Sequence, residues 1–292
     1  MKANTIKDTE SGFLRVDPIP SQEDVEKFYA KEFYDFNNQY FNNSSLLVQQ
    51  EQSDFFNSRW KNIYELSKNF FKGDLSNKSV FDIGFGFAQA LVYLKSKGLN
   101  VSGLEPSQEG VDYAKSKNIE AYHTGIENFD VVKVKHDIVL LMNVLEHLRN
   151  PKQTLLNIKD QLLAPNGLLV IDVPNDFNDF QVVANKEYDL DEWWVYPPNH
   201  INYFSHSSLK NLLEASGYKI VHCTASFPLD MFLLFGDQYI GNPELGRECH
   251  NKRVNFEELM RKHGKSDKLK AFYDSLADLN LGRSISVYAT PI

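Results

Sequence analysis

After residue 73 the chain alternates between short segments typical of β-strands and longer segments typical of helices. This alternation predicts an α/β fold, because neighbouring parallel strands need a long crossover connection, which is usually a helix on one face of the sheet. We therefore expect a mostly parallel, seven-stranded sheet with helices on both faces. Its strands are expected at residues 79–84, 100–105, 119–123, 137–143, 167–173, 218–225 and 283–290.

The helices between these strands carry their own start and stop signals. They are expected near residues 88–97, 108–117, 151–163 and 205–217. Pro151 stands where the first turn of a helix tolerates proline, and Ser205 is a candidate N-cap. Gly217 suits the left-handed conformation that often ends a helix.

Two further regions flank or interrupt this pattern. Residues 1–73 contain helix signals, among them an amphipathic spacing over residues 54–71, and predict a helical N-terminal cover on a main domain at 74–292. Residues 226–281 read as helices and loops and are too long for a simple connection before the last strand. This insertion should carry something specific to the protein.

The bulk composition excludes several classes of protein. Of the 292 residues, 42% are apolar and 24% are charged, as in ordinary soluble globular proteins. No window approaches the roughly 18 uninterrupted apolar residues of a membrane span, and the first residues lack a secretory signal, so we expect a cytoplasmic protein without a membrane partner. A net charge of −8 offers no basic surplus for nucleic acid. Cys223 and Cys249 form no C-x-x-C pair and are expected to be plain reduced thiols.

The stretch "VFDIGFGFAQAL", residues 80–91, runs from a β-type to a helix-type segment across two glycines. Gly84 and Gly86 allow a tight turn and let a ligand approach the backbone. A dinucleotide-binding turn would carry a third glycine where Gln89 stands, so that pattern fails. Asp82, two residues before Gly84, would repel a pyrophosphate but would suit a ligand that carries an ammonium and a sulfonium cation.

S-adenosylmethionine is such a ligand, and the turn resembles the first motif of the class I methyltransferases that use it, D/E-x-G-x-G-x-G. Residues 82–88 read Asp-Ile-Gly-Phe-Gly-Phe-Ala, with Ala88 in place of the last glycine. The resemblance implies a Rossmann-like fold and S-adenosylmethionine as the cofactor. It assigns cofactor binding to Asp82, Gly84, Phe85 and Gly86.

Two later stretches resemble further motifs of the same family. In "GLEPS", residues 103–107, Glu105 would accept hydrogen bonds from the ribose hydroxyls, with Pro106 beside it. In "HTGIENF", residues 123–129, Ile126 would offer its N–H to the adenine. The usual acid near the adenine amine is displaced, because Gly125 occupies its place and Glu127 stands close by.

A fourth motif and the N-terminal segment extend the resemblance. "NVLEHLRNP", residues 143–151, would place Asn143 and Val144 beside the methionine moiety. Arg59 matches a position from which relatives reach the cofactor's carboxylate; the alternative is a solvated arginine on a helix face. Tyr34 could close over the cofactor or simply pack against the domain. The preface in residues 12–34 resembles that of a subgroup whose members often begin with a cysteine zinc knuckle, and without those cysteines no metal is expected.

Histidine is the side chain best suited to accept a proton from a hydroxyl acceptor near neutral pH. His200, in a stretch that resembles the family's P-x-H-x-x-x-F-S, follows the fifth strand of the main sheet, where acceptors enter. It is the first candidate for a catalytic base, and His147 is the second. For each, the alternative is a structural hydrogen bond within its loop.

The insertion contains two features that could shape the acceptor site. An apolar run at residues 229–235 could be a core helix or the face of a homodimer. Arg247, His250 and Arg253 could recognise an acidic acceptor such as a nucleotide sugar, or could form a solvated charged surface.

Taken with the resemblance, these observations predict a methyltransferase that uses S-adenosylmethionine and acts on a small metabolite or saccharide, most often at oxygen. One alternative is a non-catalytic binding module that kept the fold, and a second is a nicotinamide-dependent oxidoreductase, which Gln89 and Asp82 disfavour.

Overall fold

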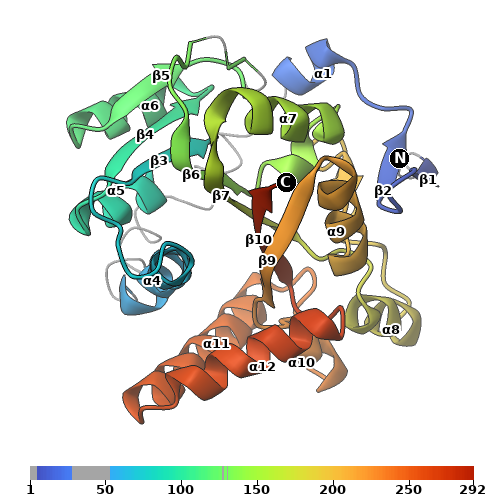
Figure 1. Cartoon of the computed structure of the whole chain (residues 1–292). Coiled ribbons are helices and arrows are strands. Elements are labelled where there is room, and N and C mark those ends of the chain that lie inside the picture. The colour runs from blue at the N-terminus through green and yellow to red at the C-terminus, as the bar shows by residue number, and fades with distance from the viewer. Residues whose placement is uncertain (1–4, 28–52, 127, 130) are drawn as a thin grey trace.

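The computed structural model describes residues 5–27, 53–126, 128–129 and 131–292. The main sheet has seven strands in the order β5-β4-β3-β6-β7-β10-β9. The first five strands in this order run parallel, and β10 is antiparallel to both of its neighbours. The predicted α/β, Rossmann-like fold with a mostly parallel seven-stranded sheet is confirmed, and Figure 1 shows it from β5 across to β9.

The strands lie close to the predicted segments. Their bounds are β3 Ser79–Ile83, β4 Asn100–Glu105, β5 Glu120–His123, β6 His136–Met142, β7 Leu163–Pro174, β9 Tyr218–Ala225 and β10 Ser284–Pro291. The helices that connect or flank them are α4 Ser53–Phe70, α5 Gln89–Ser96, α6 Gln108–Ser116, η2 Leu145–His147, α7 Pro151–Asn157, η3 Ile158–Leu162, α8 Asp179–Glu187 and α9 His206–Ala215.

Local chemistry explains where several helices begin and end. Ser205 caps α9 through a reciprocal arrangement with Ser208, in which each side chain bonds the other residue's backbone N–H. Gly217 follows α9 with a φ of +79°, the left-handed conformation predicted for it. Pro151 occupies the first turn of α7, where a missing N–H breaks no helical hydrogen bond.

Two apolar clusters cover the two faces of the sheet. One contains residues from α5, α6 and α4, such as Leu91, Val111 and Ile63, packed on β3 and β4. The other contains residues from α7 and α9, such as Leu155 and Leu212, packed on β6, β7 and β10. The central strands are buried on both sides, as the near-continuous apolar run at residues 138–141 requires.

The N-terminal residues differ from the expectation of a helical cover. Residues 5–17 instead form a β-hairpin, β1 Thr5–Asp8 and β2 Leu14–Asp17, which pairs with β8 Asn202–Tyr203 in a separate antiparallel sheet. Val16 is fully buried in a cluster with Trp194 and Tyr203. Helical periodicity could not find this hairpin, because its stabilising contacts come from a loop almost two hundred residues further along the chain. Helix α1 Gln22–Lys27 follows the hairpin.

The insertion before the last strand is helical, as predicted. It contains α10 Met231–Leu234, α11 Pro243–Lys262 and α12 Ser266–Asp278, which pack around an apolar cluster with Phe227, Phe232 and Leu269. In Figure 1, α11 and α12 lie side by side below the sheet, and α11 contacts α4. Among the residues that the structure describes, no helix combines the length and the apolar character needed to cross a membrane.

Candidate cofactor and acceptor site

The turn between β3 and α5 has the left-handed backbone that its glycines allow. Gly84 and Gly86 have φ values of +70° and +53°, and Ala88 has a φ of +52°. Alanine in this region costs roughly 1 to 2 kcal/mol relative to glycine. Ala88 nevertheless keeps the conformation that the motif's third glycine would adopt, so the substitution leaves the shape of the turn intact.

The neighbouring elements approach this turn too closely for added side chains. A Cβ on Gly84 would lie 2.9 Å from Cγ2 of Val144 and 3.4 Å from Cδ1 of Ile126. A Cβ on Gly110, in the first turn of α6, would lie 2.5 Å from the carbonyl oxygen of Gly86. Packing therefore requires a bare backbone at Gly84 and Gly110, whereas nothing lies within 4 Å of a Cβ on Gly86, and the turn lies between Val144, Ile126 and α6.

Glu105 fixes the turn from the end of β4. Its Oε2 accepts a hydrogen bond from the Gly86 N–H at 2.8 Å, and its Oε1 accepts one from the Ser107 N–H at 2.9 Å. The side chain is 4% exposed. Each carboxylate oxygen has further lone pairs, so this position can still accept the ribose hydroxyls that the resemblance assigns to it.

Asp82 is a buried carboxylate whose Oδ1 has no hydrogen-bond partner among the described residues. Burial raises its pKa well above the usual value, the nearby Glu105 carboxylate adds to the rise, and Arg59 opposes it. A cation bound over the turn would favour the ionised carboxylate. The unpartnered oxygen and the glycine turn therefore fit S-adenosylmethionine, whose ammonium and sulfonium groups are both positive.

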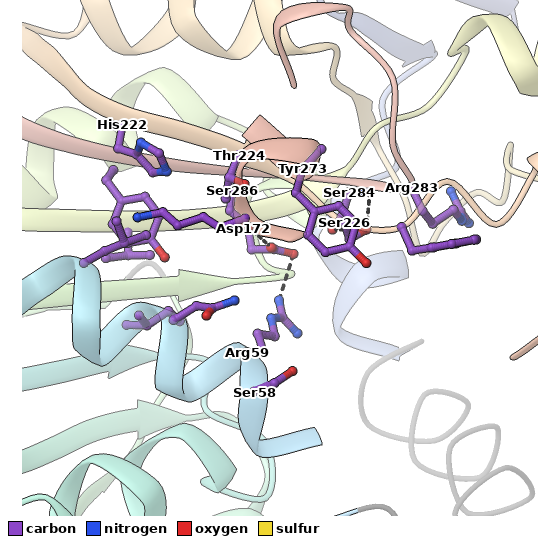
Figure 2. A pocket seen from close by; sticks show the side chains of 18 of the residues that line it. Ser58, Arg59, Asp172, His222, Thr224, Ser226, Tyr273, Arg283, Ser284 and Ser286 are labelled. Atoms are coloured by element: carbon purple, nitrogen blue, oxygen red, sulfur yellow. Dashed lines mark hydrogen bonds and ion pairs between the residues drawn. The ribbon is translucent and has the colours of Figure 1, made fainter. Parts of the chain in front are cut away.

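Arg59, Asn143 and Asp172 meet at the carboxyl ends of β6 and β7. Nη2 of Arg59 lies 2.8 Å from Oδ1 of Asp172 and donates a hydrogen bond of 3.0 Å to Oδ1 of Asn143. Asn143 has a φ of +57°, and its N–H donates to the backbone carbonyl of Asp172. Figure 2 shows Arg59 reaching from α4 to Asp172 on the sheet. The arginine is thus ion-paired at the carboxyl ends of the strands, and 41% of its side chain is exposed.

Those remaining predicted cofactor residues that the structure describes also lie at the carboxyl ends of the strands. Val144 is buried against Gly84, and the carbonyl of Pro106 accepts a hydrogen bond from Nε2 of His123 at 2.9 Å. Phe85 is buried in the cluster beneath α5. Tyr34 and Glu127 lie outside the described residues.

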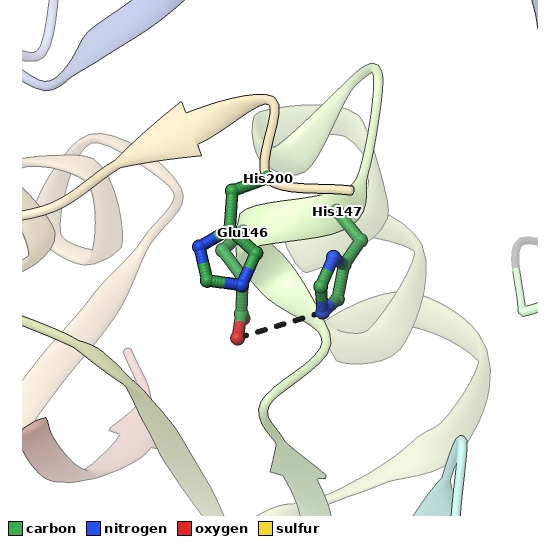
Figure 3. Close-up of side chains that lie close together, drawn as sticks. All are labelled: Glu146, His147 and His200. Atoms are coloured by element: carbon green, nitrogen blue, oxygen red, sulfur yellow. Dashed lines mark ion pairs between the residues drawn. The ribbon is translucent and has the colours of Figure 1, made fainter. Parts of the chain in front are cut away.

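The two predicted catalytic histidines lie together with Glu146, as Figure 3 shows. The rings of His147 and His200 have centroids 5.0 Å apart, and Nε2 of His147 lies 3.6 Å from Oε1 of Glu146. Nδ1 of His147 donates to the carbonyl of Asn199 at 2.6 Å, which leaves Nε2 as the nitrogen without a proton in the neutral ring. Nδ1 of His200 is buried without a hydrogen-bond partner among the described residues.

Burial makes this cluster electrically neutral near pH 7. It raises the pKa of Glu146 to about 8, with help from the Asp172 and Asp176 carboxylates. It lowers the pKa of His147 to about 4 and, together with His147, that of His200 to about 3. The contact between Glu146 and His147 therefore joins a protonated carboxyl and a neutral imidazole. Ligand atoms of the three side chains lie within 4.8 Å of one another, a spacing that a metal ion could also use.

A cavity of about 350 Å³ lies between α4, the β7-β10-β9 part of the sheet and the insertion, a size that suits small molecules. Arg59, Asn143 and Asp172 form one part of its wall. Hydroxyl groups from β9, β10 and the residue after β9 form another; in Figure 2 Thr224 and Ser286 lie beside Asp172, and Ser226 and Ser284 lie further along, towards Arg283. Those hydroxyl groups belong to Thr224, Ser226, Ser284 and Ser286.

The cavity and the histidine cluster lie on two sides of the carboxyl ends of β6 and β7. Arg283 lines the cavity, pairs with Asp176 at 3.5 Å and lies close enough to His200 to depress its pKa. Neither His147 nor His200 lines the cavity itself. The structure thus joins the two histidines to each other, and it connects their cluster to the cavity wall through Asn143, which contacts Glu146 and His147, and through Arg283.

The sequence analysis missed several residues of this region. Asp172 stands in the predicted strand at 167–173. A single acid in this apolar run was the feature that could have marked it as a site residue. Of the three charged residues proposed for the insertion, Arg253 lines the cavity, whereas Arg247 is exposed and His250 packs edge-on against Phe55. Arg261, Glu257 and Arg283 also line the cavity, and no sequence pattern singled them out.

A protein family described as a methyltransferase domain matches residues 58–223, more than half of the chain. The chain belongs to this family. The prediction of a class I methyltransferase with S-adenosylmethionine as its cofactor is confirmed. The matched region contains α4 with Arg59, the glycine turn, Glu105 and the histidine cluster, and it ends before the insertion.

Relatives and solved structures agree with this assignment. Ubiquinone biosynthesis O-methyltransferases from Rickettsia conorii and Rickettsia canadensis are 28% identical to this methyltransferase over 190 and 158 residues. These matches cover 58% and 50% of the chain, and 63% and 65% of the relatives, so the chain spans less than two thirds of their length.

The solved structures share the fold. A methyltransferase from Archaeoglobus fulgidus has a TM-score of 0.51 and 16% identity, with 88% of this chain and 99% of that chain covered. The plantazolicin methyltransferase BamL has a TM-score of 0.50 and 17% identity, with 92% and 98% covered.

Proposed function

We propose that this methyltransferase transfers the methyl group of S-adenosylmethionine to an oxygen atom of a small molecule, such as a metabolite or a saccharide. The curated relatives are named for O-methylation, which favours oxygen over nitrogen or carbon. The observation that carries the proposal is a buried, neutral histidine pair beside the edge where the cofactor-binding residues converge. A hydroxyl acceptor must lose a proton, and neutral imidazoles can take it.

The cofactor would be held by residues of the first half of the sheet. Glu105 would accept hydrogen bonds from the ribose, and Asp82 would favour the positive charges of the amino acid end. Arg59 and Asn143 would orient the carboxylate of that end. When bound, S-adenosylmethionine supplies an electrophilic methyl group on a sulfonium cation, so the protein mainly has to place a nucleophile in line with it.

The acceptor's proton would go to the histidine cluster. Nε2 of His147 carries no proton in the neutral ring, because Nδ1 donates to Asn199. Oε1 of Glu146 lies 3.6 Å from Nε2, and its carboxyl keeps its proton while His147 takes up the acceptor's, so the pair can be expected to titrate as one unit. His200, with its unpartnered Nδ1, would bind the acceptor or share the proton.

The two flanking regions would complete the site. We propose that residues 1–73 form a cover over the cofactor and that residues 226–281 form the wall on the acceptor side. The hydroxyls of Thr224, Ser226 and Ser284 offer hydrogen-bond partners to a polar, hydroxyl-bearing acceptor. This polar lining favours a metabolite or saccharide over an apolar chain.

Two measurements test the proposal. S-adenosylhomocysteine should raise the thermal midpoint of the protein by mass action, whereas NAD should leave it unchanged. Incubation with methyl-labelled S-adenosylmethionine and a small-molecule extract should then give labelled products whose NMR shifts are those of O-methyl groups. Labelled products with N-methyl or C-methyl shifts, or no transfer to any small molecule, would contradict the proposed reaction.

A further inference from the structure

Charge is unevenly distributed between the cavity and the whole protein. The chain has a net charge of −8, yet five cationic and three acidic side chains line the cavity; Arg283 is compensated by Asp176 and Asp230 just behind the wall, which leaves a surplus of about one positive charge. The cationic residues are Arg59, Arg253, Arg261, Lys270 and Arg283; the acids are Glu65, Asp172 and Glu257. A positive cavity in an acidic protein attracts and holds negatively charged small molecules.

The cationic groups of α11 are organised around a single buried acid. Glu257 is 3% exposed and accepts hydrogen bonds from Nε of Arg253 at 3.0 Å and from Nη2 of Arg261. One carboxylate between two guanidinium groups leaves one positive charge uncompensated. The guanidinium of Arg253 also lies 5.0 Å above the ring of Phe55, and Arg261 donates to the hydroxyl of Ser58 on α4 at 3.2 Å. These contacts hold both arginines in fixed positions at the cavity wall.

One buried donor in the same wall lacks an acceptor. Nη1 of Arg261 is buried and makes no hydrogen bond among the described residues, whereas the hydroxyl of the neighbouring Tyr273 has Glu257 as its partner. Arg261 and Tyr273 line the cavity, one from α11 and one from α12. Buried donors without partners are costly, more so on a charged group, and an oxyanion supplies several acceptor lone pairs at once.

We infer that the insertion side of the cavity binds the carboxylate or phosphate group of the methyl acceptor, which is therefore an anionic small molecule. Arg261 and Arg253 hold the anionic group, and the rest of the acceptor extends towards Asn143 at the carboxyl end of β6. This inference rests on the proposed methyl transfer and narrows its substrate class.

Labelled methyl transfer tests the inference and separates its failure from that of the proposed function. Products formed from methyl-labelled S-adenosylmethionine and a cell extract are passed over an anion exchanger at neutral pH. We expect the label to be retained. Label in the neutral or cationic fraction would overturn the inference while leaving methyl transfer itself established, and absence of any label transfer would contradict both.

Three variants of α11 test whether Arg261 and Glu257 control the binding of the anionic group. Arg261→Gln should raise KM for the retained acceptor by about tenfold to a hundredfold, since a charged hydrogen bond is lost. Glu257→Gln should lower that KM several-fold, because it removes the compensating negative charge. The exposed neighbour Lys262→Gln serves as the matched control and should change nothing. If the contacts among Arg253, Glu257 and Arg261 only stabilised the fold, both Arg261→Gln and Glu257→Gln would bind the acceptor more weakly. That outcome would overturn the inference.

Direct binding gives a second readout that does not depend on turnover. With the cofactor site saturated by S-adenosylhomocysteine, inorganic phosphate should raise the thermal midpoint of the wild type and of Lys262→Gln, and should not raise that of Arg261→Gln. An equal rise in all three proteins would place the anion elsewhere and contradict the inference.

Discussion

The proposed cofactor side and the proposed acceptor side of this methyltransferase are built in different ways. The cofactor side consists of consecutive strand ends and turns, from Asp82 to Val144, and it depends on backbone conformation and two carboxylates. The acceptor side is assembled from distant segments, since Ser58 on α4 and Arg261 on α11 are 203 residues apart and still share a hydrogen bond. The cofactor side therefore depends on the local shape of the backbone. The acceptor side depends on which charged side chains the fold brings together.

This difference explains why the two sides should respond differently to mutation. The turn is tightly packed at Gly84, so an added side chain at that position should remove cofactor binding outright. Side-chain charges can be changed one at a time, so the acceptor side should show graded changes in KM and kcat with an intact cofactor site.

The largest effect is expected at the glycine turn. Gly84→Val would place a branched side chain at a φ of +70° with its Cβ 2.9 Å from Val144. We expect no measurable binding of S-adenosylhomocysteine by calorimetry. Gly98→Ala is the control, because it has a φ of +88° but nothing within 4 Å of the added Cβ. Equal affinities in the two variants would show that the turn does not hold the cofactor.

Substitutions in the histidine cluster should lower turnover without changing the affinity for the cofactor. We expect His147→Asn and His200→Gln each to lower kcat by about a hundredfold, a usual loss for a missing proton acceptor. Their affinity for S-adenosylhomocysteine should equal that of the wild type. The exposed His263→Gln is the matched control. If both cluster variants kept full kcat across the pH range, the cluster would have no catalytic role.

Glu105 should show an intermediate effect on the cofactor side. Glu105→Gln keeps one acceptor oxygen for the turn but loses the charge, and we expect about a tenfold weaker binding of S-adenosylhomocysteine. Glu109→Gln, an exposed acid in the first turn of α6, should leave the affinity unchanged. Unchanged affinity in Glu105→Gln would remove this carboxylate from the ribose contact.

An effect of a different kind, on folding rather than on activity, is expected in the pH dependence of stability. His147 and His200 have folded pKa values of about 4 and about 3, below the ordinary value of 6.5, so the unfolded chain takes up their protons first. Their neutral burial supports folding above pH 6.5, and this support is lost as the pH falls towards 4. Each histidine should lower the free energy of unfolding by roughly 1 kcal/mol for each pH unit across that window.

Glu146 acts in the opposite direction. Its folded pKa of about 8 lies above its ordinary value of 4.5, so its support is complete below pH 4.5 and is lost as the pH rises through 8. Denaturant unfolding between pH 4 and 9 should therefore give a maximum near neutral or slightly acidic pH. Replacing His200 with glutamine should flatten the acidic limb, and an unchanged limb would contradict its neutral burial.

The sequence was sufficient for the parts of the fold that depend on local patterns. Strand positions, the Ser205 cap and the glycine turn follow from period, capping chemistry and φ preferences, and the structure confirms them. The hairpin at residues 5–17 could not be found this way, because its partner strand is β8. A short polar strand without its partner does not differ from a loop.

The same limit applies within the site. The cofactor motif could be recognised because its residues are close in sequence, as with Asp82 and Gly84. The ion pair of Arg59 with Asp172 and the arginines around Glu257 depend on which helices meet across the sheet. Charged residues on an amphipathic helix such as α11 look alike in sequence, and only the fold separates those that line the cavity from those in solvent.

A crystal structure with S-adenosylhomocysteine tests the central claim most directly. The account predicts that its ribose lies within hydrogen-bonding distance of the Glu105 carboxylate and that its sulfur faces the edge formed by Asn143 and Asp172. Density for the ligand anywhere other than over the turn at residues 82–88 would contradict the account.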